Sequence, residues 1–166
     1  MLILFCVRQM NISELCKDLS PESLVRLLQS NANICESVVH EQGGSVVRLL
    51  GEYIIMAWKA DHVPVPDYSE ISKTMAQKIS EAREKIKSGL IRKASISISM
   101  TKGDCVFEQD GNHFTHVFGT PMNRVLRIAD KFLAADKNVI LVDESLKTIW
   151  SNYVLESIGD GVFRVQ

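Results

Sequence analysis

The segment from His40 to Trp58, HEQGGSVVRLLGEYIIMAW, decides the fold of this 166-residue chain. Its Gly43-Gly44 pair marks the end of a helix, because glycine readily takes the backbone conformations that stop one. The runs Ser45 to Leu50 and Tyr53 to Trp58 are rich in β-formers, and only Gly51-Glu52 separates them. This spacing predicts a β-hairpin with a two-residue turn and Glu52 at its tip.

The residues before this hairpin predict one strand and one long helix. Leu2 to Val7 is a short, continuous apolar run, which is typical of a strand buried on both faces. Ser20-Pro21-Glu22 has the features of a helix start, with a serine cap, a proline at the first helical position and an acid in the first turn. Apolar residues then recur every three or four positions, so we predict a helix from about Pro21 to Gln42.

The residues after the hairpin continue the alternation of helices and strands. An apolar stripe from Ile71 to Ile86 predicts a helix that lies on the sheet. Ala94 to Met100 alternates apolar residues with serine, which indicates a half-buried strand. Thr120-Pro121 opens a further helix that we expect to reach about Ala135. The predicted elements that remain are a short strand at Cys105 to Phe107, a buried strand at Val139 to Val142, a short helix at Asp143 to Trp150 and two strands around Gly159-Asp160-Gly161.

This order of elements predicts an α+β protein. A ferredoxin-like β-α-β-β-α-β core would be followed by further C-terminal α and β elements, with the helices on one side of a mainly antiparallel sheet. We expect residues 1–166 to form a single domain, since this length is sufficient to bury a core without disulfides or metals.

Composition excludes several classes of partner. The formal net charge is −1 and no segment concentrates Lys and Arg, so we expect no nucleic acid partner.

The four cysteines have irregular spacing, which indicates reduced thiols. The apolar opening Met1 to Val7 is far shorter than the ~20 residues of a membrane span. We therefore expect an unprocessed, cytoplasmic protein without a membrane span.

Several strings, in their order and separation, resemble the catalytic domain of class III adenylyl and guanylyl cyclases across nearly the whole chain. The helix that begins at Leu19 to Glu22, the double glycine and the Gly51-Glu52 hairpin resemble the family's helix, double glycine and Gly-Asp hairpin. Phe118 to Arg127, FGTPMNRVLR, is similar to the family's Gly-x-x-x-Asn-x-x-x-Arg helix start. Asn138 to Val142 resembles its late strand, and Trp58 at the end of the hairpin resembles the soluble adenylyl cyclase type.

The resemblance implies the class III nucleotidyl cyclase fold and an active site shared by two domains that pair head to tail. In that family the 3′-hydroxyl of ATP or GTP attacks the α-phosphate and pyrophosphate leaves. Two carboxylates of one half hold two Mg²⁺ (or Mn²⁺) ions, while an Asn and an Arg of the other half position the ribose and stabilise the charge at phosphorus. Asn123 and Arg127 match that pair and lie four residues apart, on one face of a helix. From spacing alone, two solvated helix residues are the simpler interpretation, and only the wider match to the family favours the functional pair.

The resemblance places the metal ligands at two positions that depart from the family pattern. Glu52 matches the second metal aspartate, although an ordinary exposed turn acid is an equal interpretation. The first metal aspartate falls on Arg8, and the family's nearby glycine falls on Asn11. A cation at that position would repel Mg²⁺ and attract phosphate directly, so Arg8 is a candidate nucleotide-binding residue. This half would then be unable to hold two metals by itself.

The residues that would read the base give a weaker prediction. Arg48 lies where many adenylyl cyclases have a purine-reading Lys, and Thr115 and Thr120 lie near the second base-reading position, which favours ATP mildly. For Arg48, an outward-facing strand residue is the simpler interpretation. His113-x-x-His116 has too few partners for a metal site, so we interpret the two histidines as loop residues.

Two functions follow from these residues. In the first, the chain is one half of an adenylate cyclase and forms cyclic AMP with a second cyclase domain that supplies the metal carboxylates. In the second, it is a catalytically inactive pseudo-cyclase domain that acts as a dimerisation or regulatory module. Either way, a homodimer would place Arg8 in both metal sites, and we expect it to be inactive.

Overall fold

The computed structural model describes residues 1–62, 66–84, 94–111, 113–132, 135 and 137–166. Its elements, in chain order, are β1 (Leu2–Gln9), α1 (Ile12–Asp18), α2 (Pro21–Glu41), β2 (Ser45–Leu50), β3 (Tyr53–Lys59), α3 (Tyr68–Glu84), β4 (Ile96–Gly103), β5 (Val106–Asp110), β6 (His113–Phe118), α4 (Thr120–Ala129), β7 (Val139–Asp143), the 3₁₀ helix η2 (Glu144–Trp150), β8 (Leu155–Ser157) and β9 (Val162–Val165). The α+β prediction is confirmed.

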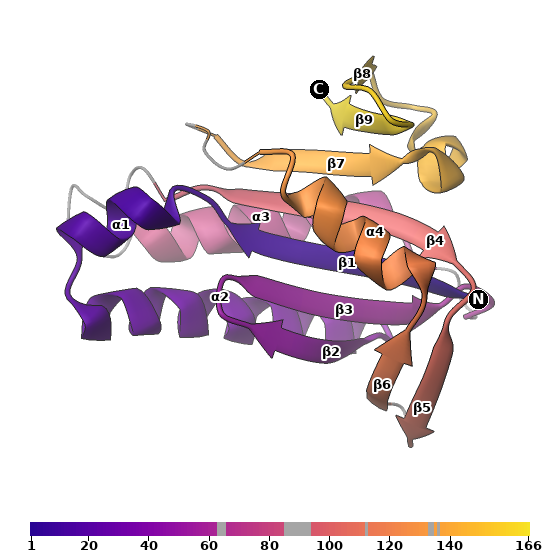
Figure 1. The fold of residues 1–166 in the computed structure, drawn as a ribbon, viewed down its shortest axis with the longest axis horizontal. Helices are drawn as coiled ribbons and strands as arrows, with labels where there is room; N and C mark the ends of the chain where they lie inside the picture. Colours follow the sequence, from indigo (N-terminus) through magenta and orange to yellow (C-terminus); the bar gives the residue numbers. More distant parts are fainter. Residues whose placement is uncertain (63–65, 85–93, 112, 133–134, 136) are drawn as a thin grey trace.

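A seven-stranded sheet in the order β2-β3-β1-β4-β7-β9-β8 forms the centre of the fold (Figure 1). Its first four strands are antiparallel neighbours in the order of a ferredoxin-like core, as predicted. β7 then pairs with β4 in parallel, and β9 and β8 complete the sheet. β5 and β6 form a separate two-stranded arm that projects from the end of the sheet near the N-terminus.

Helices cover both faces of the sheet, so the prediction that they lie on one side was wrong. Alternate residues of β1 point to opposite faces. Ile3, Phe5 and Val7 pack in one core cluster with residues of α2, α3 and η2. Leu2, Leu4 and Cys6 pack in a second cluster with Val125 and Ala129 of α4. Figure 1 shows α2 and α3 behind the sheet and α4 in front of it.

The β4 strand is buried on both faces, which corrects the prediction of a half-buried strand. Ser97 and Ser99 are fully buried, because α4 lies over them. Their hydroxyls donate to the backbone carbonyls of Ala129 (3.2 Å) and Val125 (2.9 Å) of α4. The alternating serines are therefore polar contacts between the sheet and α4 rather than a solvent-facing row.

The hairpin of β2 and β3 has the predicted position and turn. Gly44 lies so close to Trp58 that an added Cβ would stand 2.4 Å from the indole ring, which explains a glycine there. The helix predicted to begin at Pro21 ends at Glu41, one residue before the predicted end. The stripe predicted to Ile86 belongs to α3, and Ile86 itself lies outside the described residues.

Other element boundaries differ from the sequence prediction. The helix α4 ends at Ala129, well before Ala135. The short helix α1 and the strand β6 were not predicted, and the short strand predicted at Cys105 to Phe107 is the longer β5. No helix in the described part of the chain has the length and apolar character needed to cross a membrane.

Candidate active site

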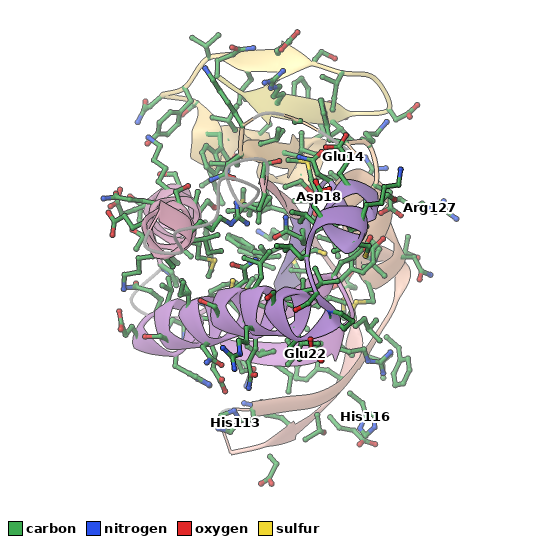
Figure 2. The ribbon with its side chains drawn as sticks, turned by 90° about the vertical axis from the view of Figure 1, so that its left-hand side faces the viewer. Glu14, Asp18, Glu22, His113, His116 and Arg127 are labelled. Carbon is green, nitrogen blue, oxygen red and sulfur yellow. The ribbon has the colours of Figure 1, made fainter. Side chains whose placement is uncertain are left out.

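The helix α4 presents the two residues matched to the family's Asn and Arg. Gly119 precedes it with φ 147°, a conformation that favours glycine, and Pro121 lies in its first turn. Val125, Ile128 and Ala129 face the sheet and are buried. Asn123 and Arg127 lie on the opposite side and are exposed, and Figure 2 shows Arg127 at the outer margin of the molecule. The predicted common face of these two residues is thus directed to solvent.

Arg124 in α4 and Lys131 just after it anchor the helix to the end of β7 and to the turn between β8 and β9, which we call the C-terminal hairpin. Arg124 donates to the Asp143 carboxylate and, at 2.9 Å, to the backbone carbonyl of Asp160. Lys131, just after α4, donates to the Asp160 carboxylate at 2.8 Å. Burial alone would raise the pKa of Asp143, but hydrogen bonds from Ser145 and Arg124 outweigh it and lower that pKa. The carboxylate is therefore held in its charged form as a fixed anchor for Arg124.

The C-terminal end of β1 carries polar side chains toward both faces of the sheet. Gln9 faces α2 and α3, where its amide oxygen accepts from Asn31 and Arg83, both at 3.0 Å. Arg83 is buried, and burial lowers its pKa to about 10. Arg8, one residue earlier, faces the opposite side, toward α4.

Arg8 is the centre of an ion cluster that joins three parts of the fold. Its Nε and Nη2 atoms donate to Glu52 Oε1 at 3.0 and 2.7 Å. Its Nη1 atom lies 3.2 Å from Asp130 Oδ1, at the end of α4. The Tyr53 hydroxyl donates to the same Asp130 oxygen at 2.8 Å, and the Tyr53 ring lies 5.2 Å from the guanidinium carbon. We call Arg8, Glu52, Tyr53 and Asp130 the Arg8 cluster.

The Arg8 cluster joins one cation to two carboxylates, and the cation is largely shielded from solvent. The Arg8 side chain is 8% exposed and faces two carboxylates, of which Glu52 is 21% and Asp130 49% exposed. The contact of Nη1 with Asp130 is an ion pair by distance, yet this atom makes no hydrogen bond of acceptable geometry. Burial and the hydrogen bond to Asp130 raise the pKa of Tyr53 to about 12, so its hydroxyl remains a donor at neutral pH.

The cluster does not fit the two-metal site of the cyclase family. The position that the resemblance assigns to the first metal carboxylate holds the Arg8 guanidinium, and Glu52 already accepts two hydrogen bonds from it. Both hydrogen bonds go to Oε1, and a metal cation bound at the other oxygen of Glu52 would lie close to the positively charged guanidinium, which would repel it. Within the part of the chain that the structure describes, no group of three or more His, Cys, Asp or Glu residues could hold a metal ion.

Asn11 occupies the turn that follows β1. It has φ 58°, in the left-handed region, and it precedes α1. Its side-chain amide donates to Ser95 Oγ at 3.2 Å and to the carbonyl of Ala135 at 3.0 Å. Asparagine tolerates this backbone conformation better than most residues, so Asn11 can replace the glycine that the resemblance places there.

The three candidate base-reading residues are exposed and lie on different elements. Arg48 is on the edge strand β2, next to a register shift between Val46 and Arg48. Thr115 is on β6 of the arm, and Thr120 is the first residue of α4. No hydrogen bond joins any two of these described side chains. Their proposed common role therefore stays a prediction.

The two histidines of His113-x-x-His116 lie on β6, a strand rather than a loop. The His113 ring lies 5.3 Å from that of His40, and His116 Nδ1 lies 3.0 Å from the carboxylate of Glu108. Figure 2 shows both histidines on the arm, away from Arg127.

Sequence reasoning missed Tyr53 and Asp130. Asp130 lies seven residues after Asn123 and three after Arg127, so helical spacing places it on their face of α4. That spacing was a usable signal for Asp130. Nothing in the sequence indicated that this carboxylate meets Arg8, because the two residues are far apart in the chain.

Solved structures provide the comparison for this arrangement. The adenylyl cyclase CyaB from P. aeruginosa matches with a TM-score of 0.75 and 14% identity, covering 99% of this chain and 93% of that one. The monomeric guanylyl cyclase domain of the RhoGC fusion protein from the aquatic fungus Blastocladiella emersonii matches with a TM-score of 0.70 and 17% identity, covering 99% and 93%.

A third match is the guanylate cyclase domain of RhGC from Catenaria anguillulae in complex with GTP, with a TM-score of 0.67 and 17% identity over 99% and 95% of the two chains. No protein-family model matches the sequence, and no curated protein matches it. The likeness is therefore one of fold, over the whole chain, to both adenylyl and guanylyl cyclases.

Proposed function

We propose that this chain, which has the fold of class III adenylyl and guanylyl cyclase catalytic domains, is the half of a two-domain cyclase that supplies Asn123 and Arg127. A second cyclase-homology domain would supply the metal carboxylates, and ATP would bind between the two. The observation that carries the proposal is the pair itself, exposed together on one face of α4 while the helix beneath it is anchored to the sheet.

The exposure of this pair supports a role at an interface. Neither Asn123 nor Arg127 is used by a hydrogen bond or ion pair within the described part of the chain. The neighbouring Arg124 and Lys131 are both committed to the C-terminal hairpin. An arginine left free beside two committed cations is available for the phosphate of a nucleotide held by another domain.

The Arg8 cluster is the reason for proposing a second domain. This half holds a guanidinium where a metal carboxylate would be needed, and its one candidate ligand, Glu52, is paired with that guanidinium. Mg²⁺ or Mn²⁺ would therefore belong to the carboxylates of the other half. A homodimer would lack them in both of its sites, so we expect no cyclase activity from it.

The proposed reaction is the cyclisation of ATP. The 3′-oxygen forms a new ester bond to the α-phosphorus, and the bond from that phosphorus to the oxygen bridging to the β-phosphate breaks. Pyrophosphate leaves with the electron pair, the hydroxyl proton passes to water, and cyclic AMP remains. Arg127 would stabilise the extra negative charge at phosphorus, and Asn123 would hold the ribose in line.

The finer parts of the proposal rest on fewer residues. Adenine is favoured over guanine by Arg48 and by Thr115 and Thr120, which we propose contact the nucleotide; the matched structures include cyclases of both kinds. We also propose a cytoplasmic setting, consistent with the four free cysteines.

Reconstitution of cyclase activity with a partner domain that is inactive by itself tests the proposal. The partner is a cyclase domain that has both metal carboxylates but carries alanine in place of its own Asn and Arg of the pair. Adding this chain should generate cyclic AMP, whereas Arg127→Ala should lower kcat about 10²- to 10³-fold. Arg26→Ala, which removes an exposed arginine of α2, is the matched control and should retain full activity. Absence of product with the wild-type chain would refute the proposal.

The alternative function, a regulatory pseudo-cyclase domain, is favoured by the closed Arg8 cluster. The same assay distinguishes the two functions when the partner domain retains its own Asn and Arg and is active by itself. If this chain is a regulator, adding it changes the partner's rate of cyclic AMP formation, and the Arg127→Ala variant causes the same change. If this chain is a catalytic half, the cyclic AMP formed with its help is lost in Arg127→Ala.

A further inference from the structure

We infer that Arg8 is the resident cation of this half, and that it positions Arg127 by holding the last turn of α4 against the hairpin tip without a divalent metal. The inference rests on the proposed function for the role of Arg127. The tie itself, however, is a property of this chain that can be measured without a partner.

The guanidinium bridges two segments that nothing else in the cluster links through charge. One edge of its fork, Nε and Nη2, binds Glu52 at the tip between β2 and β3. The other side, Nη1, faces Asp130 directly after α4. A planar fork can meet two carboxylates at once, which a single point charge such as an ammonium does less well.

Asp130 transmits this tie to the helix. It is the C-cap of α4, and its backbone N–H donates to the carbonyl of Leu126 at 3.1 Å. Arg127 is in the last turn of the helix, three residues before Asp130 and on the same face. The position of the Asp130 carboxylate therefore restrains the turn from which Arg127 projects.

A second set of contacts anchors another side of α4. Arg124 binds Asp143 at the end of β7, and Lys131 binds Asp160 between β8 and β9; neither side chain forms an ion pair with a carboxylate of the Arg8 cluster. Loss of Arg8 should then release one side of the last turn while the other stays attached. The expected effect is local loosening rather than loss of the helix.

Hydrogen–deuterium exchange on the purified full chain tests this. In Arg8→Ala, the amides of residues 127–130 should exchange about two- to fivefold faster, as expected for the loss of an ion pair to a half-exposed carboxylate, while the amides of α2 keep their rates. Guanidinium chloride at low millimolar concentration should restore protection, because the free ion fits between the same two carboxylates. Sodium chloride at equal concentration is the control for ionic strength.

Two further variants make the result specific. Asp130→Asn should loosen the same amides, and guanidinium should not rescue it, since Arg8 still fills the site and one of the two carboxylates is gone. Arg48→Ala, which removes an exposed arginine from the same hairpin, should leave them unchanged. Unchanged exchange in Arg8→Ala, an equal rise in α2 and α4, or restoration by sodium as well as guanidinium would each overturn the inference.

Exchange on the isolated chain also separates this inference from the proposed function. A result with local loosening and guanidinium rescue supports the tie even if reconstitution yields no product. Conversely, product formation with unchanged exchange in Arg8→Ala would support the cyclase half and reject Arg8 as its positioning residue. Should Arg8→Ala not fold, Asp130→Asn tests the same tie from its exposed side and should loosen residues 127–130. Tyr53→Phe removes only the hydrogen bond from Tyr53 to Asp130, so it measures the separate share of that bond.

Discussion

The coupling between Arg8 and Glu52 can be predicted quantitatively from the structure. Two opposite charges 2.7 Å apart attract by about 6 kcal/mol at an effective dielectric constant of about 20, before the cost of removing them from water is subtracted. Arg8 is 8% exposed and Glu52 21%, so solvent screens this pair only weakly. After desolvation, we expect a net coupling energy of about 2 kcal/mol.

A double-mutant cycle measures this quantity. Arg8→Met leaves two carboxylates without a cation and should lower the free energy of unfolding by about 3 kcal/mol. Glu52→Gln should cost about 1 to 2 kcal/mol, because the amide oxygen can still accept from Arg8 and Asp130 remains close. The loss of unfolding free energy in the double variant should be about 2 kcal/mol smaller than the sum of the losses in the two single variants.

Urea unfolding at neutral pH is the assay, with stability extrapolated to zero denaturant for all four proteins. The matched cycle pairs Arg8→Met with Asp130→Asn, and its coupling should stay below about 1 kcal/mol because the Asp130 carboxylate is half exposed and screened. A coupling for Arg8 and Glu52 below about 0.5 kcal/mol would refute the buried ion pair as described.

Three other predictions follow from contacts described above. Asp143→Asn should lower the free energy of unfolding by about 1 to 3 kcal/mol at pH 7. Because hydrogen bonds lower the pKa of Asp143 in the folded state, this stability difference should be complete above about pH 4 and should vanish as pH falls through the lowered pKa. Urea unfolding at several pH values measures it. Gly44→Ala should cost several kcal/mol, since its Cβ would clash with Trp58, whereas Gly51→Ala, with open space around it but φ 56°, should cost only about 1 kcal/mol; equal thermal shifts would contradict this. In the reconstituted enzyme, Arg127→Lys should recover little of the activity lost in Arg127→Ala, because an ammonium lacks the planar fork; a steady-state rate near wild type would exclude a bidentate role.

The parts of the fold that local sequence controls were predictable. The hairpin of β2 and β3 has its predicted residues, with Lys59 added at the end of β3, because turn spacing and β-formers act within a few positions of each other. Serine at alternate positions of β4 misled the burial prediction, since the partners of those hydroxyls are carbonyls of α4, more than twenty residues away. The periodicity of a sequence shows that a side chain is polar, but it does not show which distant element buries that side chain.

Part of the candidate site was likewise predictable from local sequence, and part of it depends on segments that are distant in the chain. The Asn123 and Arg127 face follows from a spacing of four residues on one helix, and the structure directs it outward as a consequence of burying Val125 and Ile128. The departure at Arg8 was visible in the sequence, but its consequence was not. The two carboxylates that neutralise Arg8 come from the hairpin tip and the end of α4, and only the folded sheet brings these segments to the end of β1.

The Arg8 cluster also constrains how this sequence can change over evolutionary time. A single replacement of Arg8 by aspartate, the reverse of the departure from the family pattern, would place a third carboxylate beside Glu52 and Asp130 with no resident cation. Repulsion among the three carboxylates would disfavour both their ionisation and the folding of the chain. A change toward a metal-binding half therefore requires either a bound cation at the moment of the change or an earlier substitution of Asp130. The ion cluster thus makes the departure from the family pattern at Arg8 difficult to reverse one residue at a time.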